Sequence, residues 1–205
     1  MSPPPLPWKA RAALLVCTLL AGLVGLSASE DMMRLRRLSE VQLLLPRSPL
    51  ISAEVMKQAE EVARASLFGM RGPRMVVLAL LTIACTATFI AVLRVWKPLG
   101  LPRAGVLKLT SFAALACGLL RTIEGAQQAV IVRRIAFVLA AGVGQGSEAI
   151  PDPEVARAFA RLLPDLEVAA HVAWTLLIAG TFVTLSQYFR SPRARELFTA
   201  GDPSP

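Results

Sequence analysis

Long apolar blocks alternate with short charged segments along this chain of 205 residues. Four of the blocks carry almost no charge and approach the roughly 20 residues that an α-helix needs to cross the hydrocarbon core of a bilayer. The pattern therefore predicts an all-α fold, a polytopic integral membrane bundle with four transmembrane helices. The predicted spans cover residues 12–28, 75–93, 106–126 and 166–189.

The first block, residues 12–28, admits two interpretations. It follows a proline-rich head that carries Lys9, and it ends in the small residues 27–29. A basic start, an apolar centre and a small-residue end are typical of a cleavable secretory signal. The same residues suit an uncleaved anchor helix, in which Gly22 and Gly25 permit close helix contact. Both alternatives place the residues that follow outside the cytoplasm.

The second block, residues 75–93, is uncharged and lies between Arg74 and Arg94. It is predicted to cross the membrane, with the flanking arginines near the two interfaces. Its centre is rich in small and hydroxylated residues, which recur at helical spacing. These residues predict a packing seam against another helix, and the alternative is a face that contacts a solute. The recurring positions are Ala84, Thr88 and Ala91.

The third block is shorter, because only 12 uncharged residues separate Lys108 from Arg121. A crossing over residues 106–126 must therefore carry charged groups near both ends, where long basic side chains can reach the interface. The alternative is a hairpin or re-entrant pair that also includes residues 129–146. The glycines at the end of that second run, Gly142, Gly144 and Gly146, predict a bend.

The fourth block, residues 166–189, follows Pro164 and Asp165, which predict a helix break and then an N-cap. A separate helix over residues 153–163 is predicted before the break. Asp152 is its expected N-cap, with a proline at the first helical position. Its apolar side chains fall on one side, so we expect it to lie at the membrane interface. These side chains are Val155, Phe159, Leu162 and Leu163.

The segment between the first two spans predicts two amphipathic helices on the outer side. The first, Met32 to Leu45, is too polar to span and suits the headgroup plane. The second begins after an N-cap at Ser52, covers residues 53–68 and is closed by Gly69. It is expected either to rest on the bundle as a solvated helix or to present a docking surface to a partner.

Basic residues indicate the orientation. The segments 1–11, 94–108 and 190–205 carry 2, 4 and 3 basic residues, a higher density than the remaining segments, so they are expected to be cytoplasmic. Both termini are then cytoplasmic if the first helix is retained. The chain thus divides into a signal or anchor helix (1–29), an extracytoplasmic helical segment (30–74), a membrane bundle (75–189) and a basic tail (190–205). Arginine outnumbers lysine 18 to 4, as in proteins from high-GC bacterial genes, which suggests a bacterial inner membrane.

The net charge of +8 does not indicate nucleic-acid binding, because the basic residues flank apolar blocks and form no continuous patch with aromatic residues. Cys17, Cys85 and Cys117 each fall inside an apolar block and are interpreted as small core residues. Their spacing predicts neither disulfides nor a zinc site. No cofactor, metal site or catalytic motif is predicted.

A few polar residues inside the spans are candidates for function. On the third span Arg121, Glu124 and Gln128 continue a small and polar stripe that a helix would turn toward the bundle interior. Arg121 and Glu124 can form an ion pair that ends the helix, and the alternative is a pathway for a solute or proton. On the fourth span Glu167 and His171 are one turn apart, where they can touch. The earlier members of the stripe are Thr110, Ala114 and Cys117.

The sequence therefore predicts a non-catalytic structural or accessory membrane protein, which contacts the lipid bilayer and associates with other membrane proteins or with itself. The alternative function is transport of a small solute, ion or proton along the stripe of the third span. A third hypothesis is a membrane enzyme with Glu167 and His171 as an acid and base pair.

Overall fold

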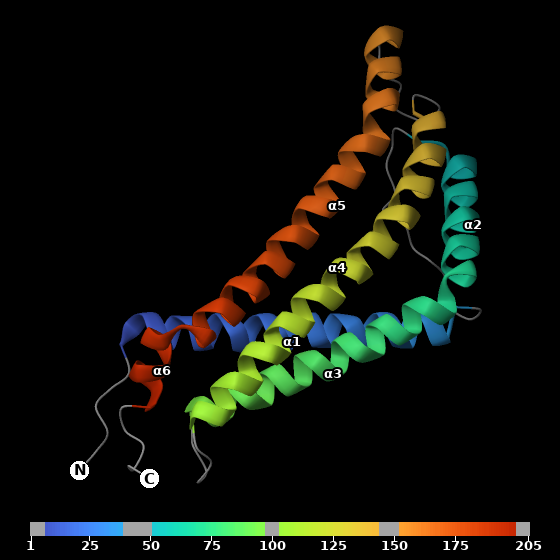
Figure 1. The fold of residues 1–205 in the computed structure, drawn as a ribbon. Helices are drawn as coiled ribbons and strands as arrows, with labels where there is room; N and C mark the ends of the chain where they lie inside the picture. The colour runs from blue at the N-terminus through green and yellow to red at the C-terminus, as the bar shows by residue number, and fades with distance from the viewer. Residues whose placement is uncertain (1–6, 39–50, 97–102, 144–151, 200–205) are drawn as a thin grey trace. The chain divides into compact units, whose positions relative to one another are not determined.

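The computed structural model describes residues 7–38, 51–96, 103–143 and 152–199, and most of these residues are α-helical (Figure 1). Ile51 and Val143 pair in an isolated bridge, and the described residues contain no strand. The predicted all-α fold is confirmed. In chain order the helices are α1 (Trp8–Arg36), α2 (Ala53–Gly69), α3 (Arg71–Trp96), α4 (Arg103–Ala141), α5 (Pro153–Arg190) and α6 (Pro192–Thr199).

Four of these helices, α1, α3, α4 and α5, are long and apolar enough to span a membrane. α4 contains 39 residues and α5 contains 38. At about 1.5 Å of rise per residue each is roughly 57 Å long, whereas the hydrocarbon core of a bilayer is about 30 Å thick. Both helices therefore extend well past the length that a crossing requires.

The chain forms two compact units, and the long helices contribute to both. Unit 1 contains Met1–Asp31, Val77–Thr122 and Leu176–Pro205, and unit 2 contains Met32–Val76 and Ile123–Thr175. Unit 1 thus holds most of α1 and α3, the first half of α4, the last part of α5 and α6. Unit 2 holds α2, the second half of α4 and the first part of α5.

Buried positions on the long helices recur at alternating steps of three and four residues. This heptad-like spacing keeps one face of each helix turned toward its neighbours, as in helices packed at a shallow angle. Large apolar side chains on the other faces, such as Leu19 and Ile83, remain exposed. The buried seam of α1 contains Ala10, Leu14, Cys17, Ala21, Val24 and Ala28, and that of α3 contains Leu78, Leu81, Cys85, Thr88, Val92 and Val95.

The small residues in the centre of α3 lie on this seam. Thr88 and Ala91 are buried, and Ala84 is half-buried. The Thr88 hydroxyl donates to the carbonyl of Ala84 at 2.8 Å, which satisfies it within the helix. The predicted packing seam is therefore confirmed, since these positions are used for helix contact inside unit 1.

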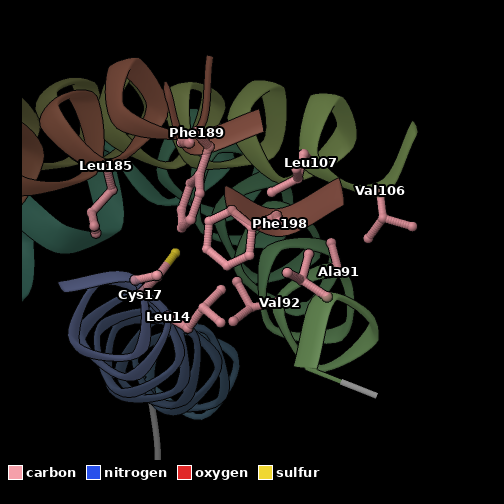
Figure 2. Packing of buried hydrophobic residues seen from close by; sticks show 12 residues of the cluster. Leu14, Cys17, Ala91, Val92, Val106, Leu107, Leu185, Phe189 and Phe198 are labelled. Atoms are coloured by element: carbon pink, nitrogen blue, oxygen red, sulfur yellow. The ribbon is translucent and has the colours of Figure 1, made fainter. Parts of the chain in front are cut away.

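A hydrophobic cluster in unit 1 joins side chains from five helices (Figure 2). α1 contributes Leu14 and Cys17, which are fully buried. The rings of Phe189 on α5 and Phe198 on α6 lie 6.3 Å apart between centroids. Helices from both ends of the chain thus belong to the same core as the middle helices.

The helix α6 lies within the segment that the sequence assigned to a basic tail, and no helix was predicted there. Ser191 precedes it, and the Ser191 hydroxyl accepts a hydrogen bond from the amide of Ala194 at 3.2 Å. Pro192 occupies the first helical position, where its missing amide hydrogen costs nothing. Ala194 and Phe198 lie one turn apart and are buried. The sequence features that indicate this helix are its serine-proline start and one apolar face. They cover only eight residues, too few to be recognised in a charged segment.

The starts of α2 and α5, in contrast, were predicted correctly. The Ser52 hydroxyl accepts a hydrogen bond from the amide of Val55 at 3.4 Å, and α2 ends at Gly69 as expected. The Asp152 carboxylate accepts hydrogen bonds from the amide of Glu154 at 2.7 Å and from that of Val155 at 3.5 Å. Both side chains satisfy amides that a helix leaves unpaired in its first turn.

The predicted break at Pro164 is wrong, because α5 runs through it without interruption. The separate helix 153–163 is the first part of α5, and Asp165 lies exposed within the helix instead of capping it. A proline removes one amide donor and leaves the carbonyl four residues earlier without that partner. The turns on either side keep their own hydrogen bonds, so one missing bond does not end a helix of 38 residues.

The hairpin alternative for the third span is also wrong. α4 continues from Arg103 to Ala141 as one helix that contains the predicted crossing. Gly142 directly follows the helix and forms a turn, which confirms a change of chain direction there, while Gly144 and Gly146 lie outside the described residues. A β-carbon at Gly142 would overlap the side chain of Val55, so glycine is required for α4 to end against the start of α2.

The amphipathic helix predicted from Met32 to Leu45 does not begin at Met32. α1 continues without a break past the small residues 27–29, and Met32–Arg36 form its last turns. Leu35 and Leu38 are buried in the protein. Residues 39–45 of the expected helix lie outside the described residues.

Candidate functional site

The small and polar stripe predicted on α4 faces inward. Arg121 and Gln128 are half-buried, and the other predicted members of the stripe are buried. The opposite face of α4 carries large apolar side chains that are between 48% and 61% exposed. The separation of the two faces is therefore confirmed. The buried members of the stripe are Thr110, Ala114, Cys117 and Glu124, and the exposed side chains are Leu109, Phe112, Leu119 and Ile123.

Glu124 accepts a hydrogen bond from Arg74 of α3, with 3.1 Å between Nη2 and Oε1. The two side chains are 4% and 3% exposed, so the ion pair is buried in unit 2. Burial removes each charge from water, and the attraction between the two charges and their hydrogen bond offset part of that cost. Sequence reasoning paired Glu124 only with Arg121 and missed Arg74. The sequence did contain an indication of this pair. Arg74 precedes the second predicted span and Glu124 lies near the end of the third, and the start of one span lies beside the end of the next when the two are antiparallel.

Beside Glu124, Gly125 lies against Thr175 of α5. A β-carbon at position 125 would come within 2.6 Å of the Thr175 hydroxyl oxygen, so only glycine permits this approach. Thr175 is 4% exposed, and its hydroxyl has no hydrogen-bond partner among the described residues. Thr181 and Thr184 on the same helix instead donate to the carbonyl four residues back. The Thr175 hydroxyl is therefore an unsatisfied polar group inside a helix contact.

Arg74, Glu124 and Thr175 form a buried polar layer, and Gln128 and His171 extend it by about one turn. Gln128 follows Glu124 by four residues on α4, and His171 precedes Thr175 by four residues on α5. Because α4 and α5 are antiparallel and meet at Gly125, the two side chains lie at a similar level. Gln128 Oε1 and His171 Nε2 are buried, and in the described part of the chain neither has a hydrogen-bond partner.

Glu167 is not part of the polar layer. Its side chain is exposed, one turn away from the half-buried His171. Since His171 Nε2 has no hydrogen-bond partner within the described ranges, Glu167 does not bond to this nitrogen. The structure therefore gives no geometric support to an acid and base pair at these positions, because proton transfer needs contact or a single bridging water.

The three cysteines are free and buried in unit 1, as predicted. Cys85 Sγ and Cys117 Sγ, on facing helices, lie 3.6 Å apart, and the Thr88 hydroxyl lies 3.4 Å from Cys117 Sγ. Gly25 packs on this region, since a β-carbon there would lie 3.0 Å from the β-carbon of Cys85. Among residues 7–38, 51–96, 103–143 and 152–199, no group of three or more His, Cys, Asp and Glu residues is placed to hold a metal ion.

An open groove of about 460 Å³ lies between α2 and the last part of α4 in unit 2. Phe137, which is 54% exposed, forms part of one wall. The guanidinium of Arg133 lies over the Phe137 ring, 5.6 Å from its centroid, so the α4 edge of the groove is basic. From the sequence, a docking surface on α2 was one of two alternatives, beside a solvated helix resting on the bundle, and the wall from α4 was not predicted. The lining residues are Val55, Gln58 and Val62 of α2 and Phe137, Val138 and Ala141 of α4.

Comparison of the chain with protein-family models, with curated proteins and with solved structures found no match. A proposal for its function therefore rests on the geometry of these sites.

Proposed function

We propose that this chain is an integral membrane protein with a non-catalytic structural or accessory role, performed by associating with other membrane proteins or with itself. The observation that supports this proposal is the open groove between α2 and α4, which is the groove lined by Val62 and Phe137. A groove with apolar walls and a charged edge is the usual receptor for an amphipathic helix.

The position of the groove along α4 supports a protein occupant. Glu124 lies near the end of the predicted crossing 106–126, and Phe137 lies thirteen residues further along the helix. At the rise of an α-helix this separation is roughly 20 Å. In the proposed topology the lipid tails end with the crossing, before the groove, and a protein partner supplies the apolar cover of the groove.

The proposed topology is four crossings of a cell membrane, most simply a bacterial inner membrane, with both termini in the cytoplasm. α1 is retained in this proposal, because Leu14 and Cys17 belong to the core of unit 1. Arg94, near the end of α3, and Arg190, at the end of α5, then face the cytoplasm.

A second candidate function is passage of a proton or small solute along the stripe of α4. It is supported by the buried polar layer, in which Gln128, His171 and Thr175 each have an atom without a hydrogen-bond partner among the described residues. Polar groups inside spanning helices commonly mark such pathways. Association ranks first because Gly125 and Thr175 fill the same layer with a close helix contact.

Photo-cross-linking in intact cells tests the proposed association. A benzoylphenylalanine placed at Phe137 reports on the groove, and the same residue at Ile83, which is 66% exposed in unit 1, is the matched control. We expect protein adducts from position 137 and none from position 83, where the probe meets lipid. No protein adduct from position 137, or the same adducts from both positions, would contradict the proposal.

Proton flux into liposomes tests the second candidate. We expect vesicles that contain the protein to be as tight as empty vesicles when a pH-sensitive dye is trapped inside. A flux that the protein creates, that Glu124→Gln abolishes and that Glu167→Gln leaves unchanged would instead establish passage along the stripe. Glu167 is the matched control because it is an exposed carboxylate on a spanning helix.

A further inference from the structure

The first part of α5 carries an apolar stripe that is exposed in unit 2. Its members follow one another at steps of four, three and four residues, so they occupy one face of the helix. They are between 40% and 57% exposed. Most of the stripe precedes the apolar segment 166–189, which is itself long enough to cross a bilayer. The stripe consists of Val155, Phe159, Leu162 and Leu166.

Acidic side chains border this stripe. At about 100° per residue, Asp165 and Glu154 lie roughly 90–110° from the centre of the stripe on one side, and Arg157 projects from the opposite face of α5. All three side chains are exposed. Arg161, also exposed, lies roughly 130° from the centre on the same side, and the exposed Glu167 lies roughly 110° from it on the other side. The stripe therefore has carboxylates on both sides, and the side that carries Asp165 and Glu154 holds two of them.

The groove carries the complementary charge on one edge only. Arg133 lies over Phe137 at the α4 edge. The α2 edge instead presents the exposed carboxylates of Glu54 and Glu61, which are one turn on either side of Gln58. When the border with Asp165 and Glu154 turns toward α4, Asp165 comes near Arg133 and these two carboxylates stay away from those of α2.

The stripe and the groove also lie at the same level along the helices. α4 and α5 are antiparallel and touch at Gly125 and Thr175. Phe137 is twelve residues after Gly125, and Leu163 is twelve residues before Thr175, so both lie roughly 18 Å from the contact. Two copies in one membrane share an orientation, so only surfaces of equal height can meet. The stripe of one copy and the groove of another satisfy this condition.

We propose that the groove between α2 and α4 binds the α5 stripe of a second copy of this chain. Phe159 and Leu162 of one copy pack against Phe137 and Val62 of the other, and Asp165 pairs with Arg133. The proposal rests on the proposed function and names its partner. Because two different surfaces meet, the contact closes into a dimer when two copies exchange stripes with each other, and into a ring when each copy gives its stripe to the next.

Photo-cross-linking between two differently tagged copies tests this proposal. With benzoylphenylalanine at Phe137 we expect an adduct of about twice the 21.9 kDa chain that contains both tags. Arg133→Glu should lower its yield by about tenfold, because like charges across an interface repel. Adding Asp165→Arg to the same chain should restore the yield. Arg157→Glu, on the opposite face of α5, is the control and should leave the yield unchanged.

The outcomes separate this proposal from the broader one. Adducts that contain only a different protein would overturn self-association and leave the accessory function standing. A complete lack of adducts at position 137 would contradict both. A double-tagged adduct whose yield stays the same in Arg133→Glu and in Leu162→Asp would overturn the assignment of these two surfaces. The substituted side chains are exposed, so elution of each variant at the wild-type position in size-exclusion chromatography verifies that it has folded.

Discussion

Gly125 on α4 faces Thr175 on α5 at so short a distance that a β-carbon at position 125 would overlap the threonine side chain. Gly180, also on α5, has no heavy atom within 4 Å of the place where its β-carbon would lie. One glycine is therefore required by a helix contact, and the other only weakens its helix by lacking a side chain. The same substitution at the two positions should have opposite effects.

Gly125→Ala should lower the free energy of unfolding by about 1–3 kcal/mol, because the added methyl group forces α4 and α5 apart. Gly180→Ala should raise it by roughly 0.5–1 kcal/mol, because alanine favours the helix. Thermal unfolding of the purified variants in detergent, followed by circular dichroism, measures both changes. Equal effects of the two substitutions would mean that α4 and α5 do not meet at Gly125.

The ion pair of Arg74 and Glu124 should behave as a buried pair. Arg74→Ala leaves the Glu124 carboxylate buried without this partner, so we expect the free energy of unfolding to fall by about 3–5 kcal/mol. Replacing both residues, Arg74→Met with Glu124→Leu, should recover most of the loss. Lys57→Ala on the exposed face of α2 is the control and should change stability by no more than about 0.5 kcal/mol.

A double-mutant cycle on the wild type, Arg74→Met, Glu124→Leu and the variant with both substitutions measures the coupling between Arg74 and Glu124 directly. Thermal unfolding in one detergent supplies all four values. If the two single substitutions add up to the effect of the double substitution, the two side chains do not interact.

The four apolar helices could be predicted from sequence because the length of an apolar run is a local property. The inward face of α4 was also predictable, since small and polar residues recur along it at helical spacing. Pro164 shows the limit of local rules. A proline in isolation predicts a helix end, yet the long helix around it tolerates the loss of one hydrogen bond.

The contacts that define the candidate sites could not be predicted, because they join distant parts of the chain. Arg74 and Glu124 are separated by 50 residues, and sequence spacing gave Glu124 a neighbour on its own helix instead. The groove likewise needs both α2 and the last part of α4, and only α2 was recognised as a surface. Periodicity gives the faces of helices, and packing decides which faces meet.

The buried cysteines should be inert toward an aqueous thiol reagent. Cys17, Cys85 and Cys117 are at most 1% exposed, so maleimide should modify them only after SDS has unfolded the bundle. A cysteine introduced at Ala65, an exposed position on α2, should react rapidly in the folded protein and provides the reference rate. Mass spectrometry counts the modified thiols. Modification of a native cysteine at the rate of position 65 would show that the core of unit 1 is open.

The packing of α1 predicts that the first helix stays in the mature protein. Leu14 is fully buried in the core of unit 1, and its neighbour Leu15 is 48% exposed. If α1 is retained, Leu14→Ala should lower the free energy of unfolding by about 2–5 kcal/mol, because it leaves a cavity in a packed core. Leu15→Ala, the matched control, should have a much smaller effect. The intact mass of membrane-extracted protein should include residues 1–28, and a mature chain that begins near Ser29 would show that the helix is a cleaved signal and not part of the bundle.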